Sequence, residues 1–282
     1  MTAAEKKQLM ATACKVRMGV IEGTHAAKAG HPGGSLSAAD LFTYLYFKEM
    51  NVDPKNPKWE DRDRFVLSKG HTAPGLYAAL ALRGFFPESD LLTLRHIGSH
   101  LQGHPNMNET PGVDMSTGSL GQGVSAAAGM ALAAKYQGKD CRVYTLLGDG
   151  EIQEGQVWEA FMLAHHYKLD NLVCFVDDNK YQLDGAVDKV MSHGKGIGAK
   201  FAAFGWNVIE LQDGNDVEQI YDAVQLAYDT KGVPTCIVLN TVKGLGATFA
   251  EGTGAHSSQP SKEQWDEAIA AAEKKLAEIK AQ

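Results

Sequence analysis

The chain has 282 residues, and its 27 Lys and Arg against 34 Asp and Glu give a formal net charge of −7. This acidic balance argues against nucleic-acid binding, which usually requires a basic excess, and no apolar run approaches the roughly 20 residues of a membrane helix. The start lacks the apolar core of a signal peptide, and the four cysteines form no CxxC pair. We therefore expect a cytoplasmic protein without a disulfide framework.

Short apolar runs alternate with longer helical patterns along the chain. A Thr2–Glu5 capping box predicts a helix at the start. The expected strands are 64–68, 141–147, 171–177, 206–211 and 235–242, and the expected helices are 37–50, 73–83, 119–136, 154–168 and 215–230. Most strand runs are continuously apolar, as in strands covered on both faces. The alternation predicts a three-layer α/β fold, with a mostly parallel sheet flanked by helices.

The end of the chain predicts a further helix, beginning at a Ser261–Gln264 capping box. One face of this helix is apolar and carries Trp265, Ile269, Ala272, Leu276 and Ile279. We expect this stripe to pack on the body of the same chain, with a partner surface as the alternative. The glycine-rich stretch 244–259 before it is long for a connection, which indicates a functional loop.

A Gly148-Asp149-Gly150-Glu151 motif follows an expected strand and precedes a helical pattern. Ligands of open α/β sheets bind at the carboxyl ends of strands, and glycines there let a phosphate approach backbone N–H groups. The carboxylate of Asp149 is a hard oxygen ligand suited to Mg²⁺ or Ca²⁺. Taken alone, the motif also fits a tight turn capped by aspartate.

The next strand ends in Asp177-Asp178-Asn179. Because successive parallel strands are often neighbours, Asp149 and Asn179 are expected to meet. A carboxylate, an amide oxygen and a backbone carbonyl can hold half of an octahedral metal, and a diphosphate can supply the rest. The two strand ends together predict a metal–diphosphate site.

This motif pair resembles that of thiamine-diphosphate enzymes, and further motifs narrow the resemblance to the transketolase family. They are Ala29-Gly-His-Pro-Gly33, Leu67-Ser-Lys-Gly-His71, Gln102-Gly-His-Pro105, Thr117-Gly-Ser-Leu-Gly-Gln-Gly123, the 148–160 segment, Lys243 and His256. The resemblance runs from about residue 15 to about 260 and covers the family's N-terminal, diphosphate-binding domain. The pyrimidine-binding and C-terminal domains that usually follow are not in this sequence. Residues 1–282 are therefore expected to be one cofactor-binding domain, the N-terminal subunit of a split transketolase.

The resemblance implies roles for individual residues. It implies metal ligation by Asp149, Asn179 and the backbone carbonyl of Tyr181. It implies cofactor contacts for Lys69, His71, Gly118, Leu120, Gly148, Asp149, Gly150, Glu151, Asn179, Lys243 and His256. Lysine and histidine suit diphosphate oxygens as donors, and Leu120 would pack against the aminopyrimidine ring of thiamine diphosphate.

Four histidines match the family's catalytic cluster: His31, His71, His104 and His256. Ketol transfer removes a proton from one sugar hydroxyl and returns one to the acceptor, and imidazole titrates in the range that allows both. We assign this proton transfer to His31 and His256, and the donor's C1 hydroxyl to His104. The other histidines match no motif. His96 and His100 have the spacing of a metal pair, but no further ligand stands near them.

The resemblance also implies an assembly. A partner chain would carry the two other domains, most contacts to the sugar phosphate, and the glutamate that activates the cofactor, so this chain alone is expected to be inactive. An α₂β₂ assembly is expected, with Glu154 and Glu159 in a proton-sharing network across a subunit interface. The sequence departs from the family around His256, where Ser257 and Ser258 replace the usual glycine and shift the proline.

Three alternatives remain open. One is a related thiamine-diphosphate enzyme, such as a deoxyxylulose-phosphate synthase half or the E1 α chain of an α-ketoacid dehydrogenase. The histidine cluster disfavours the dehydrogenase, and the short length disfavours the synthase. The second is a transketolase for a non-standard sugar. The third is a scaffold that binds the cofactor without catalysis, against which the intact Asp149, Asn179, His31 and His71 argue.

Overall fold

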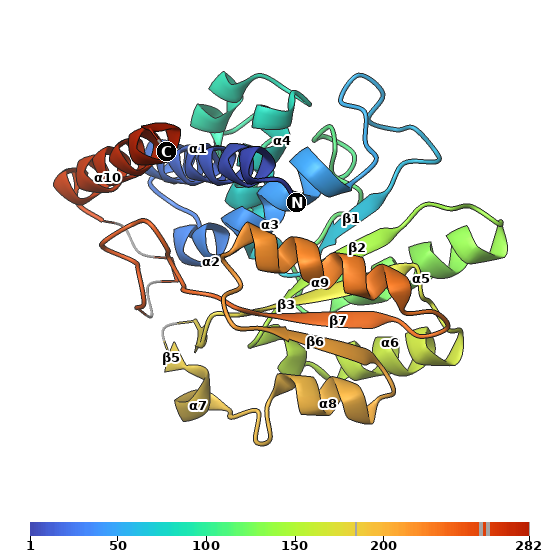
Figure 1. The fold of residues 1–282 in the computed structure, drawn as a ribbon. Coiled ribbons are helices and arrows are strands. Elements are labelled where there is room, and N and C mark those ends of the chain that lie inside the picture. Colours follow the sequence, from blue (N-terminus) through green and yellow to red (C-terminus); the bar gives the residue numbers. More distant parts are fainter. Residues whose placement is uncertain (184, 254–255, 258–259, 282) are drawn as a thin grey trace.

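A five-stranded parallel sheet forms the centre of the molecule (Figure 1). The computed structural model describes residues 1–183, 185–253, 256–257 and 260–281. The strand order is β1-β2-β3-β7-β6. The strands are β1 (Arg64–Leu67), β2 (Val143–Gly148), β3 (Leu172–Asp178), β6 (Asn207–Leu211) and β7 (Thr235–Asn240). Each expected strand is present within two residues of its predicted bounds, and the predicted three-layer α/β fold is confirmed.

The expected helices are present in the expected order, and three further short helices occur over 32–37, 187–190 and 197–203. They are α1 (Ala3–Ala27), α2 (Pro32–Ser37), α3 (Ala39–Tyr44), α4 (Ala73–Arg83), α5 (Gln122–Tyr136), α6 (Gly155–His166), α7 (Val187–Val190), α8 (Ile197–Ala203), α9 (Val217–Asp229) and α10 (Lys262–Ala281). The helix expected over 37–50 is present within two residues of its predicted bounds, as α3 and the turn that follows it. Ala38 leaves the helical conformation at φ −95° and ψ 3°, which separates α2 from α3, and residues 45–49 continue as a π-helix.

Two hydrophobic cores cover the two faces of the sheet, and the alternation of strand side chains divides them. In β3, Val173 and Phe175 belong to the core beneath α1, α3, α4 and α9. Cys174 and Val176 face the core beneath α5, α6 and α8. Successive side chains of a strand point to opposite faces, so an apolar run of this length is buried on both sides.

The last helix packs along the first, as Figure 1 shows. Trp265, Ala272 and Ile279 of its apolar stripe are buried, and the indole of Trp265 stacks on His25 of α1 at 5.4 Å between ring centroids. Packing of the stripe on the same chain is confirmed. The capping box before it is present, because the backbone N–H of Ser261 donates to Gln264 Oε1 at 2.8 Å.

Within the described ranges, no helix combines the length and apolar character needed to cross a bilayer. The four cysteines, Cys14, Cys141, Cys174 and Cys236, are all buried and unbridged.

Candidate functional site

The carboxyl edge of the sheet collects polar side chains from four separate segments. Lys69 follows β1, Asp149 follows β2, Asn179 follows β3 and Lys243 follows β7. The parallel register pairs Gly148 with Asp177, which brings the ends of β2 and β3 level. The expected meeting of Asp149 with the end of β3 is confirmed, because the Lys180 N–H donates to Asp149 Oδ2 at 2.8 Å.

A cavity of about 350 Å³ opens at this edge. It is lined by every residue predicted to contact the cofactor: Lys69, His71, Gly118, Leu120, Gly148, Asp149, Gly150, Glu151, Asn179, Lys243 and His256. Tyr181 and Glu154 also line it, together with four residues that the sequence did not indicate: Gly34, Gln153, Gln182 and Leu183. The structure thus gathers the predicted residues around one space of a size suited to a small molecule.

The carboxylate of Asp149 and the amide of Asn179 are held in place by neighbouring groups. Asp149 Oδ1 accepts from the N–H of Gly150 at 2.8 Å, and Asn179 Oδ1 accepts from the N–H of Tyr181 at 3.2 Å. Burial, together with the negative charge of Asp177, raises the pKa of Asp149 to about 7. Lys180, next to Asn179, has φ 71°, an uncommon conformation for a residue with a side chain.

No three His, Cys, Asp or Glu side chains among the described residues are arranged to hold a metal ion. The predicted ligand set contains a single residue of those types, Asp149, with an amide and a backbone carbonyl beside it.

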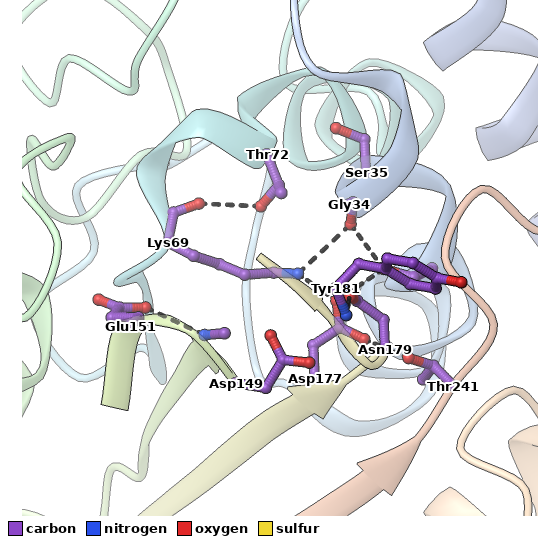
Figure 2. A network of polar contacts seen from close by, with 12 residues as sticks. Gly34, Ser35, Lys69, Thr72, Asp149, Glu151, Asp177, Asn179, Tyr181 and Thr241 are labelled. Atoms are coloured by element: carbon purple, nitrogen blue, oxygen red, sulfur yellow. Dashed lines mark hydrogen bonds and ion pairs between the residues drawn. The ribbon is translucent and has the colours of Figure 1, made fainter. Parts of the chain in front are cut away.

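Asp177 is the polar centre of the site, although its sequence position indicated no role. Its carboxylate is fully buried and forms an ion pair with Lys69 (Figure 2). It accepts hydrogen bonds from Ser37 Oγ at 2.6 Å, from Asn179 Nδ2 at 2.8 Å and from Thr241 Oγ1. Burial alone would raise the pKa of Asp177, but the Lys69 charge and these donors bring it below its usual value.

Glu151 fastens the glycine turn to the loop before α5. Its Oε1 accepts from Ser68 Oγ at 2.6 Å and from the Gly121 N–H at 2.9 Å. Its Oε2 accepts from the Gly148 N–H at 3.1 Å, so three protein donors surround this carboxylate, which Figure 2 places at the edge of the site. The geometry therefore indicates that Glu151 shapes the cavity wall.

The four predicted histidines, here called the histidine cluster (His31, His71, His104 and His256), come together beside the cavity. Ring centroids lie 5.3 Å apart for His31 and His71, 4.9 Å for His31 and His256, 4.9 Å for His71 and His256, and 6.5 Å for His31 and His104. Residues 254–255 and 258–259, which include part of the departure from the family pattern, lie outside the described residues.

Three members of the histidine cluster have lowered pKa values. Burial, with a smaller effect of nearby positive charges, lowers the pKa of His31 to about 4 and that of His71 to about 2. The pKa of His104 is lowered for the same reasons. These rings are therefore neutral near pH 7, and neutral imidazoles can accept a proton from a hydroxyl. In the described part of the chain, the buried Nδ1 of His31 has no hydrogen-bond partner, which leaves a polar atom for a ligand to meet.

The two predicted interface glutamates lie outside the histidine cluster. Glu154 is exposed at the start of α6 and at the cavity wall, and Glu159 is exposed on α6. The remaining histidines have separate surroundings. His100 contacts Asp90 at 3.2 Å, His193 contacts Lys200 at 3.2 Å, and His96 is exposed.

A parallel sheet with a glycine turn, an oxygen-donor pair and a cavity at its carboxyl edge defines an α/β domain built to hold a diphosphate cofactor. Residues 7–279 match the family described as transketolase, thiamine diphosphate binding domain. The chain belongs to this family, which confirms the resemblance found in its motifs.

The relatives are of two lengths. The chain is 48% identical to the 6-deoxy-6-sulfo-D-fructose transketolase subunit of Clostridium sp. (strain MSTE9), over 87% of this chain and 89% of that one. It is 42% identical to one of the named subunits of the apulose-4-phosphate transketolase of Phocaeicola vulgatus, over 90% of each. Transketolase of Mus musculus is 46% identical over 88% of this chain but only 39% of its own length.

Solved structures of transketolases show the same similarity and the same difference in length. Transketolase from Leishmania mexicana superposes with a TM-score of 0.86 at 30% identity, over 97% of this chain and 45% of that one. The chain therefore spans less than half of these longer transketolases.

Proposed function

We propose that this chain is the N-terminal subunit of a heteromeric transketolase, which transfers a two-carbon ketol unit from a ketose to an aldose. The observation that carries the proposal is the histidine cluster beside a cavity lined by all the predicted cofactor residues. The near end-to-end match to two proteins named as transketolase subunits supports the division into two chains.

Thiamine diphosphate and Mg²⁺ or Ca²⁺ fit the cavity. Asp149, Asn179 and the Tyr181 carbonyl offer only oxygen donors, which hard divalent cations prefer. Gly150 keeps the turn open, because a Cβ there would lie 2.7 Å from the Cβ of Gln182. Lys69, His71 and Lys243 would face the diphosphate oxygens. When bound, thiamine diphosphate supplies the nucleophilic carbon that ketol transfer requires.

The chain's own residues would move the protons. Neutral His31 would take the proton of the ketose C3 hydroxyl and return it to the acceptor oxygen, with His256 beside it as the second candidate for this role. His104 would hold the C1 hydroxyl by a hydrogen bond. Partial burial, which lowers the pKa of His31, keeps this ring neutral and able to accept a proton near pH 7.

The partner is proposed to be a chain with the pyrimidine-binding and C-terminal domains, so that residues 1–282 form one cofactor-binding domain. The exposed Glu154 and Glu159 of α6 are proposed to lie at a subunit interface in an α₂β₂ assembly. Cytoplasmic location fits the four buried, unbridged cysteines, and sugar phosphates are the proposed substrates.

The test is reconstitution. The tagged chain is purified from its native cells under mild conditions, and the eluate is analysed by native mass spectrometry for a second chain and for thiamine diphosphate. We expect the pure chain to be inactive and the complex to transfer ketol units. Turnover of xylulose 5-phosphate and ribose 5-phosphate by the pure chain would contradict the two-chain proposal.

A matched pair of variants tests the metal assignment in the complex. Asp149→Ala should abolish cofactor binding, whereas Asp188→Ala removes an exposed carboxylate from α7 and should leave it unchanged. Unchanged binding in Asp149→Ala would show that the metal assignment is wrong.

A second candidate substrate class is a non-standard sugar. The names of the two subunit-sized relatives specify a sulfonated fructose and apulose 4-phosphate. A screen of the complex against standard pentose phosphates and these two sugars distinguishes the candidates by the ratio of kcat/KM.

A further inference from the structure

Asp177 contacts both residues whose side chains are predicted to hold the metal, although its own side chain is sealed from water. Its backbone carbonyl accepts the N–H of Asp149 at 3.3 Å, and its Oδ2 accepts from Asn179 Nδ2 at 2.8 Å. The side chain of Asp177 has an exposed fraction of 0%, and it is not among the described residues that line the cavity. Any role of Asp177 toward a ligand must therefore act through its neighbours.

The contacts of Asn179 leave only one orientation for its amide group. The Asp177 carboxylate, paired with Lys69, can only accept hydrogen bonds, so the amide atom that faces it must be the nitrogen. A backbone N–H can only donate, so the amide atom 3.2 Å from the Tyr181 nitrogen must be the oxygen. Both neighbours thus select the same orientation of the amide.

This orientation decides what Asn179 offers to a cation. The side chain lines the cavity, and the Tyr181 N–H takes one of the two lone pairs of its oxygen, which leaves the second for a divalent cation. A rotated amide would direct N–H groups into the same space, and these cannot ligate a metal. The oxygen also holds the turn in which Lys180 has φ 71°, and with it the carbonyl of Tyr181, the third predicted ligand.

Asp177 can hold the amide because three other segments hold Asp177 itself. Its Oδ2 also forms the ion pair with Lys69, which follows β1, and accepts from Ser37 Oγ of α2 at 2.6 Å. Its Oδ1 accepts from Thr241 Oγ1, which follows β7. Figure 2 shows Lys69, Asn179 and Thr241 around this carboxylate. Because donors hold both oxygens, the carboxylate is kept from turning away from Asn179.

We propose that Asp177 is a positioning residue of the metal site, which orients the Asn179 amide so that its oxygen faces a divalent cation. In this role Asp177 touches no ligand and acts through Asn179. Removing such a hydrogen-bonded partner from behind a metal ligand commonly lowers metal affinity by about 10- to 100-fold. The proposal rests on the proposed function, since it specifies how this chain prepares the cation site of that reaction.

Hydrogen exchange on the full chain tests the orientation without any ligand. The side-chain NH₂ resonances of Asn179 are identified by NMR through their loss in Asn179→Asp. We expect one of these protons to exchange at least about 10-fold more slowly than the side-chain protons of Asn108, which is exposed. Exchange as fast as at Asn108 would overturn the proposal.

A metal titration of the full chain, with its partner if one co-purifies, tests what the orientation does. The probe is Mn²⁺ with saturating thiamine diphosphate, because Mn²⁺ prefers the same oxygen ligands as Mg²⁺ and its free form is counted by EPR. Asp177→Asn should weaken Mn²⁺ binding by about 10- to 100-fold. Asp178→Asn is the matched control. It removes the same charge from the next residue, whose carboxylate pairs with Lys180, and should change binding by less than about threefold.

An exchange of the two side chains separates orientation from folding. In the double variant Asp177→Asn with Asn179→Asp, the hydrogen bond can form with donor and acceptor reversed, and the charge of the pair is unchanged. An oxygen then faces the cavity whichever way residue 179 is turned. We expect this variant to recover most of the Mn²⁺ affinity that Asp177→Asn loses. If Asp177→Asn does not fold, the wild-type exchange rate and the affinity of the double variant decide the question.

The outcomes are distinct. Equal losses of Mn²⁺ affinity in Asp177→Asn and Asp178→Asn would overturn the proposal and assign the effect to charge, and a double variant as weak as Asp177→Asn would overturn it as well. A complex that binds Mn²⁺ in the expected order but transfers no ketol units would contradict the proposed function and leave the role of Asp177 standing. A wild-type chain that binds no Mn²⁺ would overturn this role, whatever its activity.

Discussion

The ammonium group of Lys69 and the carboxylate of Asp177 form an ion pair sealed from water, with side-chain exposed fractions of 2% and 0%. Lys69 follows β1 and Asp177 lies near the end of β3, so the pair spans β2 between them. It fixes the relative position of the two strand ends that form the cavity floor.

Asp177→Asn should destabilise the chain strongly, because it leaves the Lys69 cation buried without a counter-charge. The expected loss is about 3–5 kcal/mol in the free energy of unfolding, measured by urea denaturation. Asp266→Asn is the control, since it removes an exposed ion pair with Lys262 and should cost less than about 1 kcal/mol. Equal losses would show that the buried pair does not stabilise the fold.

Gly150→Ala should close the cavity floor although its backbone tolerates alanine. Gly150 has φ −69°, so the expected effect is steric, from the 2.7 Å approach to Gln182. We expect a loss of about 1–3 kcal/mol in stability and weaker binding of thiamine diphosphate by calorimetry. Gly155→Ala, at the start of α6 with nothing within 4 Å of the new Cβ, should leave binding intact. Normal binding of thiamine diphosphate by Gly150→Ala would show that the space at Gly150 is not needed for the cofactor.

Acid should destabilise the chain through its buried histidines. The pKa of His71 falls from an ordinary 6.5 to about 2 in the folded chain, chiefly through burial. Between pH 7 and pH 5 the unfolded chain therefore binds a proton at this residue and the folded chain does not, so the free energy of unfolding decreases as pH falls. Urea denaturation should show a shallower pH dependence in His71→Gln, by about 1–2 kcal/mol over this range. If the free energy of unfolding changes with pH equally in the wild type and in His71→Gln, buried His71 is not the source of the acid sensitivity.

Trp265→Ala should detach the last helix from the body. The indole is buried between His25 and Phe249, with ring centroids at 5.4 and 4.9 Å, so its removal should cost about 3–5 kcal/mol in the free energy of unfolding. Leu276→Ala, on the same stripe but half-buried, should cost clearly less. A similar loss of unfolding free energy in both variants would mean that contacts along the whole helix, rather than Trp265, hold it on the body.

The strands and most helices were predictable because apolar runs and glycine turns alternate regularly. The separate short helix α2 was not, because the local sequence carries no stop signal at Ala38, where α2 ends. The meeting of Asp149 and Asn179 followed from strand order. The gathering of the histidine cluster did not follow from spacing, since its members come from segments far apart in the chain, and only the family resemblance indicated it.

Asp177 could have been found by continuing the alternation of β3. Val173 and Phe175 face the core that α1, α3, α4 and α9 cover, so position 177 points the same way, and a carboxylate there needs a buried counter-charge.

The cavity is built from four segments that lie far apart in the sequence, and this affects when it can form during folding. Lys69, Asp149, Asn179 and Lys243 are joined only when four strands of the sheet are paired, so most of their contacts are long-range and form slowly. A nascent chain would have no complete cofactor cavity until β7 has been synthesised and has paired with the sheet. Cofactor capture should therefore report complete folding, and it should select native molecules from partly folded ones.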